Sequence, residues 1–122
     1  MAQENFFSLS DLSDGIPREL AEGLSTRIFV GEQAMLSIVT IEPNASGSTH
    51  SHPEEQWGYL LIGDGVRTQG GREVPVKAGD FWRTPGGEPH SFKGGPDGAT
   101  VLDFFAPPRA EYKKAGEGFG AG

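Results

Sequence analysis

The chain has 122 residues and a net charge of −7, which is the size of one domain with a surface that would repel nucleic-acid phosphates and anionic membranes. The sequence contains no cysteine, so disulfides, thiolate nucleophiles and cysteine-bound metals are excluded, and any metal must be held by nitrogen and oxygen atoms. Because the first residues lack the basic and apolar segments of a signal peptide and no apolar stretch approaches the ~20 residues of a membrane span, we expect a cytoplasmic protein without nucleic-acid or membrane partners.

Short strands separated by turns are predicted along most of the chain, because 19 glycines and 9 prolines are spread through it. Residues 1–23 form a polar N-terminal segment whose one candidate helical turn begins at Pro17 and ends at Gly23. The composition then predicts strands at 24–30, 33–42, 56–62, 66–69, 73–77, 81–84, 90–93 and 99–106. Turns separate them, including 63–65 and 94–98, and the Gly-rich residues 113–122 are typical of a disordered tail. This spacing predicts one all-β domain, a sandwich or barrel over residues 24–112.

Two of the three histidines lie one residue apart, at His50 and His52. In an extended strand alternate side chains share a face, so both imidazoles and Gln56 would point one way and Glu55 the other. Pro53 interrupts the stretch, and Glu55 is a rival to Gln56 as a further ligand. The alternative is a solvent-exposed His-x-His pair, with both neighbouring glutamates as solvated charges.

A third histidine, His90, follows a Pro-Gly-Gly turn that could bend the backbone and present its ring inward. The sequence here resembles the cupin family. The residues that match its two motifs are His50, His52 and Gly63 for the first, with Gln56 in place of the usual glutamate, and Gly79, Pro85, Gly87 and His90 for the second. Asn44 stands where the first motif usually begins with glycine, and Gly94 where asparagine often follows the second. The resemblance, over residues 24–109, implies a single-domain jelly-roll β-barrel with a metal in its mouth.

The candidate metal ligands are therefore His50, His52, Gln56 and His90, all of them uncharged. A neutral set of ligands leaves the charge of a divalent ion uncompensated, which would make the ion a strong Lewis acid. The sequence predicts one divalent transition metal, and Ni, Zn, Fe, Mn, Cu and Co all fit a nitrogen-rich site. The alternative for Gln56 is a surface position or a supporting role behind the ligands.

The last predicted strand carries a carboxylate and leads to an arginine. Asp103 and Phe105 share one face of residues 99–106, while Phe104 faces the other way and is expected in the core. Apolar neighbours would raise the pKa of Asp103 and suit it to proton transfer. Two following prolines could direct Arg109 over the barrel mouth, where it would hold a substrate carboxylate. A structural Asp103–Arg109 ion pair, or a surface position for Arg109, is the alternative.

This ending resembles that of a group of small single-domain cupins, some of which act in pectin and alginate degradation. Those members convert 4,5-unsaturated uronates to linear keto sugars, with three histidines and a glutamine at the metal and an aspartate, a phenylalanine and an arginine around the substrate. The resemblance implies that Asp103 and Arg109 are catalytic and that Phe105 and Arg109 contact the substrate. Trp82 is a further candidate for substrate contact.

Three functions are left open by these observations. The first is a metal-dependent lyase or isomerase that acts on an unsaturated uronate or a similar small carboxylated sugar. The second is an oxygen-dependent cupin dioxygenase, and the third is a non-catalytic module that binds or senses a small molecule. The resemblance also supports a homodimer, in which residues 1–30 could cover an exposed strand edge of a second copy.

Overall fold

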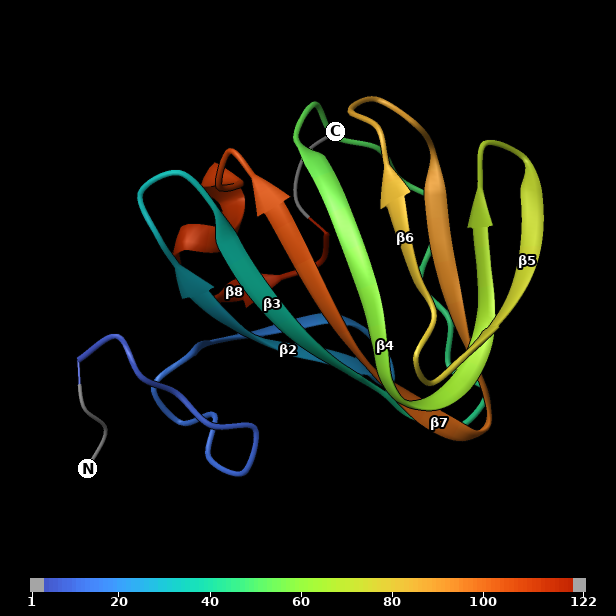
Figure 1. Cartoon of the computed structure of the whole chain (residues 1–122), viewed down its shortest axis with the longest axis horizontal. Coiled ribbons are helices and arrows are strands. Elements are labelled where there is room, and N and C mark those ends of the chain that lie inside the picture. The colour runs from blue at the N-terminus through green and yellow to red at the C-terminus, as the bar shows by residue number, and fades with distance from the viewer. Residues whose placement is uncertain (1–3, 120–122) are drawn as a thin grey trace.

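Eight strands and one short 3-10 helix make up the fold in a computed structural model, which describes residues 4–119 (Figure 1). The prediction of an all-β domain is confirmed. In chain order the elements are β1 (Ile16–Ala21), β2 (Leu24–Val30), β3 (Met35–Ile41), β4 (Glu55–Gln69), β5 (Arg72–Lys77), β6 (Phe81–Thr84), β7 (His90–Ala106), the helix η1 (Ala110–Lys113) and β8 (Gly116–Glu117). Among residues 4–119, no helix has the length and apolar character needed to cross a membrane.

The strands form one continuous sheet in the order β5-β4-β7-β3-β2-β1-β8, and β6 pairs with β4 beside this path. All pairs are antiparallel except β1 with β8. The long strands β4 and β7 pair along most of their length and bend midway, so that the sheet folds over on itself around an interior (Figure 1). This is the jelly-roll arrangement that the cupin resemblance implies.

The bends lie at residues 63–65 and 94–98, where turns between separate strands were expected. In the structure both segments continue within β4 and β7, with the register shifted between Gly63 and Gly65. Gly63 and Gly98 have positive φ angles of 88° and 76°, which L-residues with a side chain rarely adopt. The glycines therefore bend two paired strands together and do not reverse the chain.

The candidate helical turn in the N-terminal segment is wrong, because residues 16–21 form β1 and pair with β2. Arg18 and Leu20 are buried and their neighbours are more exposed, the period of two that is typical of a strand. Pairing with a neighbouring strand outweighs the weak local preference for a helical turn.

The Gly-rich segment also differs from the expected disordered tail. Residues 116–117 form β8, which pairs with β1 at Arg18 and Glu19. The Arg18 guanidinium donates hydrogen bonds to the carbonyls of Glu111, Glu117 and Gly118 at 2.7–2.9 Å. Of the predicted tail, residues 120–122 lie outside the described residues.

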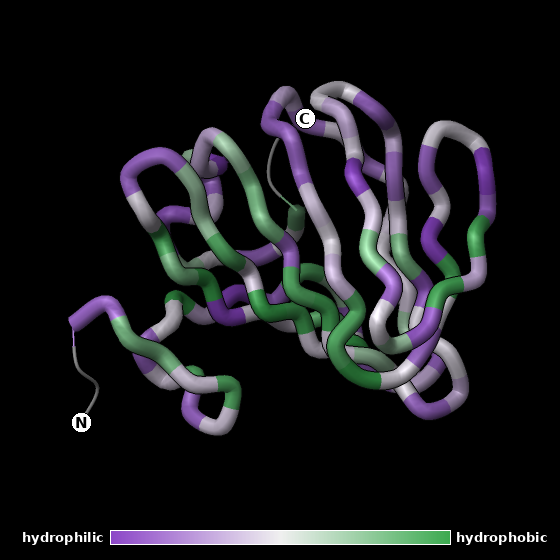
Figure 2. The backbone as a smooth tube through the Cα atoms, in the orientation of Figure 1, coloured by the Kyte–Doolittle hydropathy of each residue, from purple (hydrophilic) through white to green (hydrophobic). Residues whose placement is uncertain are grey.

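The core fills the space between the two layers of the folded sheet. Apolar segments of β3, β4 and β7 gather where these strands lie side by side, and hydrophilic residues gather in the loops (Figure 2). The buried apolar side chains include Leu24, Ile28, Met35, Val39, Leu60, Val101 and Phe105.

On β7 the prediction that Phe104 packs in the core is wrong, since Phe105 is 2% exposed and Phe104 is 37% exposed. Asp103 consequently shares the inward face with Phe105, and Phe104 lies on the outer face.

The close approach of the two bends predicts a stability difference between two glycine substitutions. A Cβ on Gly63 would lie 2.1 Å from the Gly98 carbonyl oxygen, whereas a Cβ on Gly71, which also has a positive φ of 79°, would meet nothing within 4 Å. We expect Gly63→Ala to lower the free energy of unfolding by about 3 kcal/mol and the matched control Gly71→Ala by about 1 kcal/mol. Chemical denaturation measures both; equal losses would show that the bend tolerates a side chain.

Candidate metal centre

Three imidazoles meet at one end of the interior. His50 and His90 form an isolated antiparallel bridge, with backbone N–H···O distances of 3.1 and 2.9 Å in the two directions. The ring of His90 lies 4.5 Å from that of His50 and 4.9 Å from that of His52, between centroids. One ring nitrogen of each histidine lies within 4.8 Å of the others. The convergence thus comes from pairing with His90, and not from a regular strand through residues 50–56, because β4 begins only at Glu55.

Backbone carbonyls fix which nitrogen of each ring faces the centre. Each Nδ1 lies near a main-chain oxygen: Ser48 O at 3.1 Å for His50, Glu54 O at 3.1 Å for His52 and Glu88 O at 2.8 Å for His90. A carbonyl oxygen can only accept a hydrogen bond, so each Nδ1 carries the hydrogen and each Nε2 presents a lone pair. This is the arrangement by which metal-binding histidines are usually oriented. The Nε2 of His90 is buried and has no hydrogen-bond partner.

Gln56 completes the group from the inward face of β4. Its Oε1 lies 3.0 Å from His52 Nε2, and the side chain is buried. With the His52 hydrogen on Nδ1, two lone-pair acceptors face each other without a proton between them. Such a contact is repulsive unless a cation binds both atoms, and two ligands at right angles with bonds of about 2.1 Å would be about 3.0 Å apart. The donor set therefore fits a divalent transition metal, and the three histidines could hold one.

The histidines are poised to bind a cation at neutral pH because they are uncharged. Burial lowers the pKa of His50 to about 4 and that of His90 to about 3, against the opposing effect of their backbone hydrogen bonds. The pKa of His52 is also lowered, first by burial and then by the positive charge of Arg109. Protons would therefore compete weakly with a metal ion at neutral pH.

Asp103 lies beside this group, in a cavity of about 40 Å³ that His50, Gln56, Phe105 and Arg67 also line. Its Oδ1 is buried without a hydrogen-bond partner. Burial raises the pKa of Asp103, opposed by the charge of Arg67, by a hydrogen bond with Gln56 and by Arg109. Since a carboxylate accepts hydrogen bonds, it is the Gln56 amide NH₂ that faces Asp103, which leaves Oε1 directed at His52.

Arg67 is the residue of this cavity that sequence reasoning missed. It is buried, donating to Thr84 Oγ1 at 2.8 Å and to Gln69 Oε1 at 3.2 Å. The four-residue strand predicted at 66–69 was too short to reveal an inward face. The full β4, with its two register shifts between Leu60 and Gly65, is needed to place Arg67. Burial lowers the pKa of Arg67 to about 10, so it remains a cation inside the barrel.

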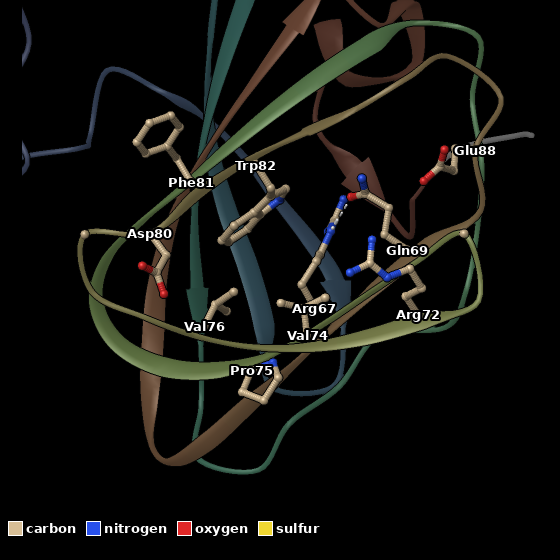
Figure 3. A pocket seen from close by; sticks show the side chains of 12 residues that line it. Arg67, Gln69, Arg72, Val74, Pro75, Val76, Asp80, Phe81, Trp82 and Glu88 are labelled. Atoms are coloured by element: carbon tan, nitrogen blue, oxygen red, sulfur yellow. Dashed lines mark hydrogen bonds between the residues drawn. The ribbon is translucent and has the colours of Figure 1, made fainter.

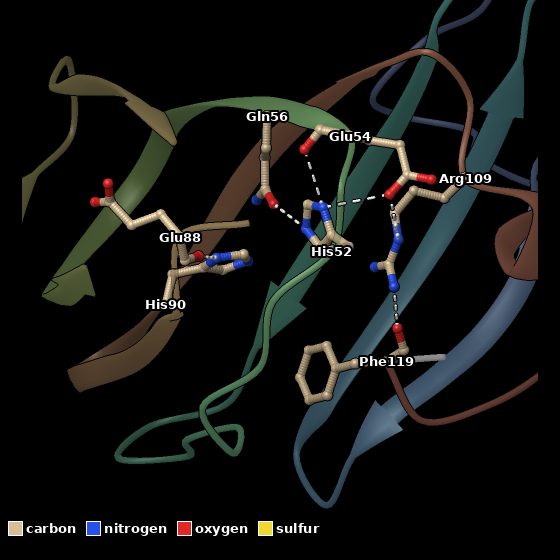
Figure 4. A network of polar contacts seen from close by, with 7 residues as sticks. All are labelled: His52, Glu54, Gln56, Glu88, His90, Arg109 and Phe119. Carbon is tan, nitrogen blue, oxygen red and sulfur yellow. Dashed lines mark hydrogen bonds and ion pairs between the residues drawn. The ribbon is translucent and has the colours of Figure 1, made fainter. Parts of the chain in front are cut away.

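The two glutamates beside the histidine pair have different surroundings. Glu55, the rival ligand, points outward, where it accepts hydrogen bonds from Trp57 at 2.8 Å and Arg83 at 3.2 Å. Glu54 is not the solvated charge that we expected: its side chain is 14% exposed, with Oε1 3.5 Å from His52 Nδ1 and 3.9 Å from Arg109 Nε (Figure 4). Pro53 turns the chain before β4, so the side chains after it do not follow the simple alternation.

Arg109 lies inside the molecule at 1% exposure, which excludes the surface position. Its guanidinium stacks over the Tyr112 ring at 4.2 Å, and Nη2 donates to the Phe119 carbonyl. Nε and Nη1 are buried without hydrogen-bond partners. Within residues 4–119 its ion pair is with Glu54 and not with Asp103.

The two aromatic candidates line different cavities. Phe105 lies by the histidines, with its ring 5.5 Å from that of His52. Trp82 lies farther along the barrel, stacked on Phe92, and lines a separate pocket of about 530 Å³ with Arg67 and Gln69 (Figure 3). The structure therefore brings Phe105, but not Trp82, into the cavity that contains His50 and Gln56.

Comparison with known proteins agrees with this architecture. An oxalate-binding protein of Thermotoga maritima is 35% identical over 89 residues, which cover 72% of each chain. An RmlC-like cupin from Shewanella frigidimarina superposes with a TM-score of 0.78 at 22% identity, over 90% of this chain and 96% of that one. The structure of KdgF from Halomonas sp. gives a TM-score of 0.77 at 22% identity, over 89% and 98%. Residues 37–105 match the family described as the cupin domain, and the chain belongs to this family.

Proposed function

We propose that this cupin is a metal-dependent enzyme for a small carboxylated molecule, with His50, His52, His90 and Gln56 as ligands of one divalent transition metal. The observation that carries the proposal is the pair of facing acceptors, His52 Nε2 and Gln56 Oε1, 3.0 Å apart. A cation between them would turn a repulsive contact into a shared coordination sphere. The bound metal would act as a Lewis acid that polarises a substrate oxygen.

An anionic substrate is favoured by the charges enclosed around the site. The buried cations Arg67 and Arg109 face two carboxylates, Glu54 and Asp103, and the raised pKa of Asp103 weakens its contribution of negative charge. A divalent ion would leave the group with an excess of positive charge. A carboxylate ligand would compensate that excess, and Arg109 Nη1, which is buried without a hydrogen-bond partner, offers it a donor.

For the reaction we propose conversion of a 4,5-unsaturated uronate, or a similar sugar acid, to its linear keto form. The donor set of three histidines and one glutamine and the ending with Asp103, Phe105 and Arg109 support this choice by their resemblance to cupins that perform it. Ring opening and ketonisation require proton transfers, and a carboxyl group whose pKa is raised by burial suits them. Asp103 would exchange the proton, and Arg109 would orient the substrate carboxylate.

The reaction is tested by incubating the metal-loaded protein with 4,5-unsaturated galacturonate and following the ring alkene signal by NMR. We expect loss of this signal well above the buffer rate and a decrease of about 10²–10⁴-fold in Asp103→Asn. The variant's metal content should equal that of the wild type. Decay at the buffer rate with a full complement of metal would reject the uronate reaction.

Carboxylate binding without turnover is a second candidate, favoured by the 35% identity to an oxalate-binding protein. A cavity of about 40 Å³ beside the histidines also suits a ligand smaller than a sugar. Calorimetric titration of the metal-loaded protein with oxalate separates the two. Tight oxalate binding, with no decay of oxalate or of the uronate alkene, would favour the binding function.

The ligand role of Gln56 predicts a loss of metal affinity in Gln56→Ala. Removal of one of four ligands should weaken binding by more than about a hundredfold, the upper range for loss of a residue that only supports a ligand. Gln69→Ala is the matched control, because Gln69 also hydrogen-bonds inside the barrel but contacts Thr84 and Arg67. Elemental analysis and competition with a chelator measure both; wild-type occupancy in Gln56→Ala would remove Gln56 from the ligand set.

We also propose a homodimer, and place its contact on the outer face of β4, β6 and β7. Trp57, Tyr59, Phe81 and Phe104 are 37–70% exposed there, and register pairs join Trp57 to Phe104 and Tyr59 to Phe81. A contiguous aromatic face of this kind is typical of protein contacts. Light scattering should give twice the chain mass for the wild type and a monomer for Trp57→Lys; a monomeric wild type would contradict the proposal.

A further inference from the structure

Residues 114–119, here called the C-terminal strap, run from the end of η1 along β1 to the ring of His50. Two of its residues pair with β1 as β8, and the Gly118 N–H donates to the Glu19 carbonyl at 2.8 Å. The Arg18 guanidinium donates to the carbonyls of Glu117 and Gly118 in the strap and of Glu111 before it. These polar contacts hold residues 116–118 of the strap against β1.

The strap ends with Phe119 against the histidines. The Phe119 ring stacks on that of His50, with centroids 4.2 Å apart and an interplanar angle of 23°. It also lines the cavity that contains Gln56 and Asp103. Gly47 makes room for it, since a Cβ on Gly47 would lie 2.5 Å from the ring. The aromatic ring therefore lies over His50 and forms part of the wall of this cavity.

The backbone carbonyl of Phe119 accepts a hydrogen bond from Arg109, the arginine that would hold a substrate carboxylate. Arg109 Nη2 donates to the Phe119 carbonyl, and Arg109 Nε lies 3.9 Å from Glu54, whose carboxylate approaches His52 (Figure 4). A chain of polar contacts thus joins the strap to a histidine of the metal centre. The Phe119 carbonyl takes one donor of Arg109 that a carboxylate oxygen would otherwise use.

We infer that Phe119 is a plug that determines which carboxylates reach the site, because a ligand must displace it to gain both Arg109 and the space over His50. This inference rests on the proposed function. A carboxylate is a charged and bidentate partner for a guanidinium, so it can replace a single neutral carbonyl. The strap can yield because only two of its residues belong to a strand. A small anion would disturb the ring least, and a sugar acid would have to move it fully.

The first test uses metal-free protein, so it stands apart from metal binding. Diethyl pyrocarbonate modifies accessible neutral imidazoles, and mass spectrometry of peptides gives the rate at His50. We expect a rate several-fold higher in Phe119→Ala than in the wild type, and also in Arg18→Lys, which loosens the strap and keeps the plug. Phe6→Ala is the control, since Phe6 is an exposed aromatic residue in the N-terminal segment. Equal rates in all four proteins would overturn the inference.

The second test titrates the zinc-loaded proteins with D-galacturonate and with oxalate by calorimetry. Removal of the plug should tighten galacturonate binding on the order of tenfold, because the wild type must expose a partly buried phenyl ring before the sugar enters. We expect a smaller gain for oxalate and no change for Phe6→Ala. If zinc binds and the galacturonate affinity of Phe119→Ala is unchanged, the role of Phe119 as a plug is contradicted. If zinc does not bind, the proposed function is contradicted. The modification rates at His50 would then be the test of the plug.

Discussion

The pairing of β4 with β7 is the constraint on which the site depends. Its register sets Gln56 opposite Phe105 and Gly58 opposite Asp103, and beyond the bends it sets Gln69 opposite His90. Gln56 and Asp103 are thereby brought to one inward face from strands far apart in the sequence. The bridge from His90 to His50 then adds the remaining imidazoles. A shift of β4 by one residue against β7 would turn Gln56 toward solvent and bring Glu55 inside, while Asp103 kept its inward position.

The interior combines uncharged candidate ligands with enclosed charges of both signs. The imidazoles and the Gln56 amide bring no charge to a cation, whereas Arg67 and Arg109 bring two positive charges that only part of the surroundings compensates. Burying unpaired charges is costly unless they gain a partner. The proposed function offers a reason for this cost, since the Arg109 donors that lack a hydrogen-bond partner are groups that a bound anion could satisfy.

Much of this arrangement could be predicted from the sequence, where short-range patterns decide it. The resemblance of the stretches around His50, His52, Gln56 and His90 to the two cupin motifs predicted which residues come together, and strands 24–30 and 81–84 match the structure at both ends. The failures are those in which distant contacts decide the outcome. The candidate helical turn is a strand because it pairs with β2. The expected turns at 63–65 and 94–98 are bends within β4 and β7, because the two strands stay paired through them. Contacts to Arg18 order residues that composition alone assigns to a tail. The inward Arg67 and the plug at Phe119 depend on the same distant contacts.

The orientation of the imidazoles rests on main-chain oxygens at positions 48, 54 and 88. Every residue has a main-chain carbonyl, so the side chains at these three positions could change in evolution without rotating a ring or moving its hydrogen. The donor set is robust to point mutation nearby and vulnerable to insertions, deletions or new prolines that shift the backbone. Related chains could accordingly acquire new specificities by altering the residues around the mouth while the orientation of the three rings persists.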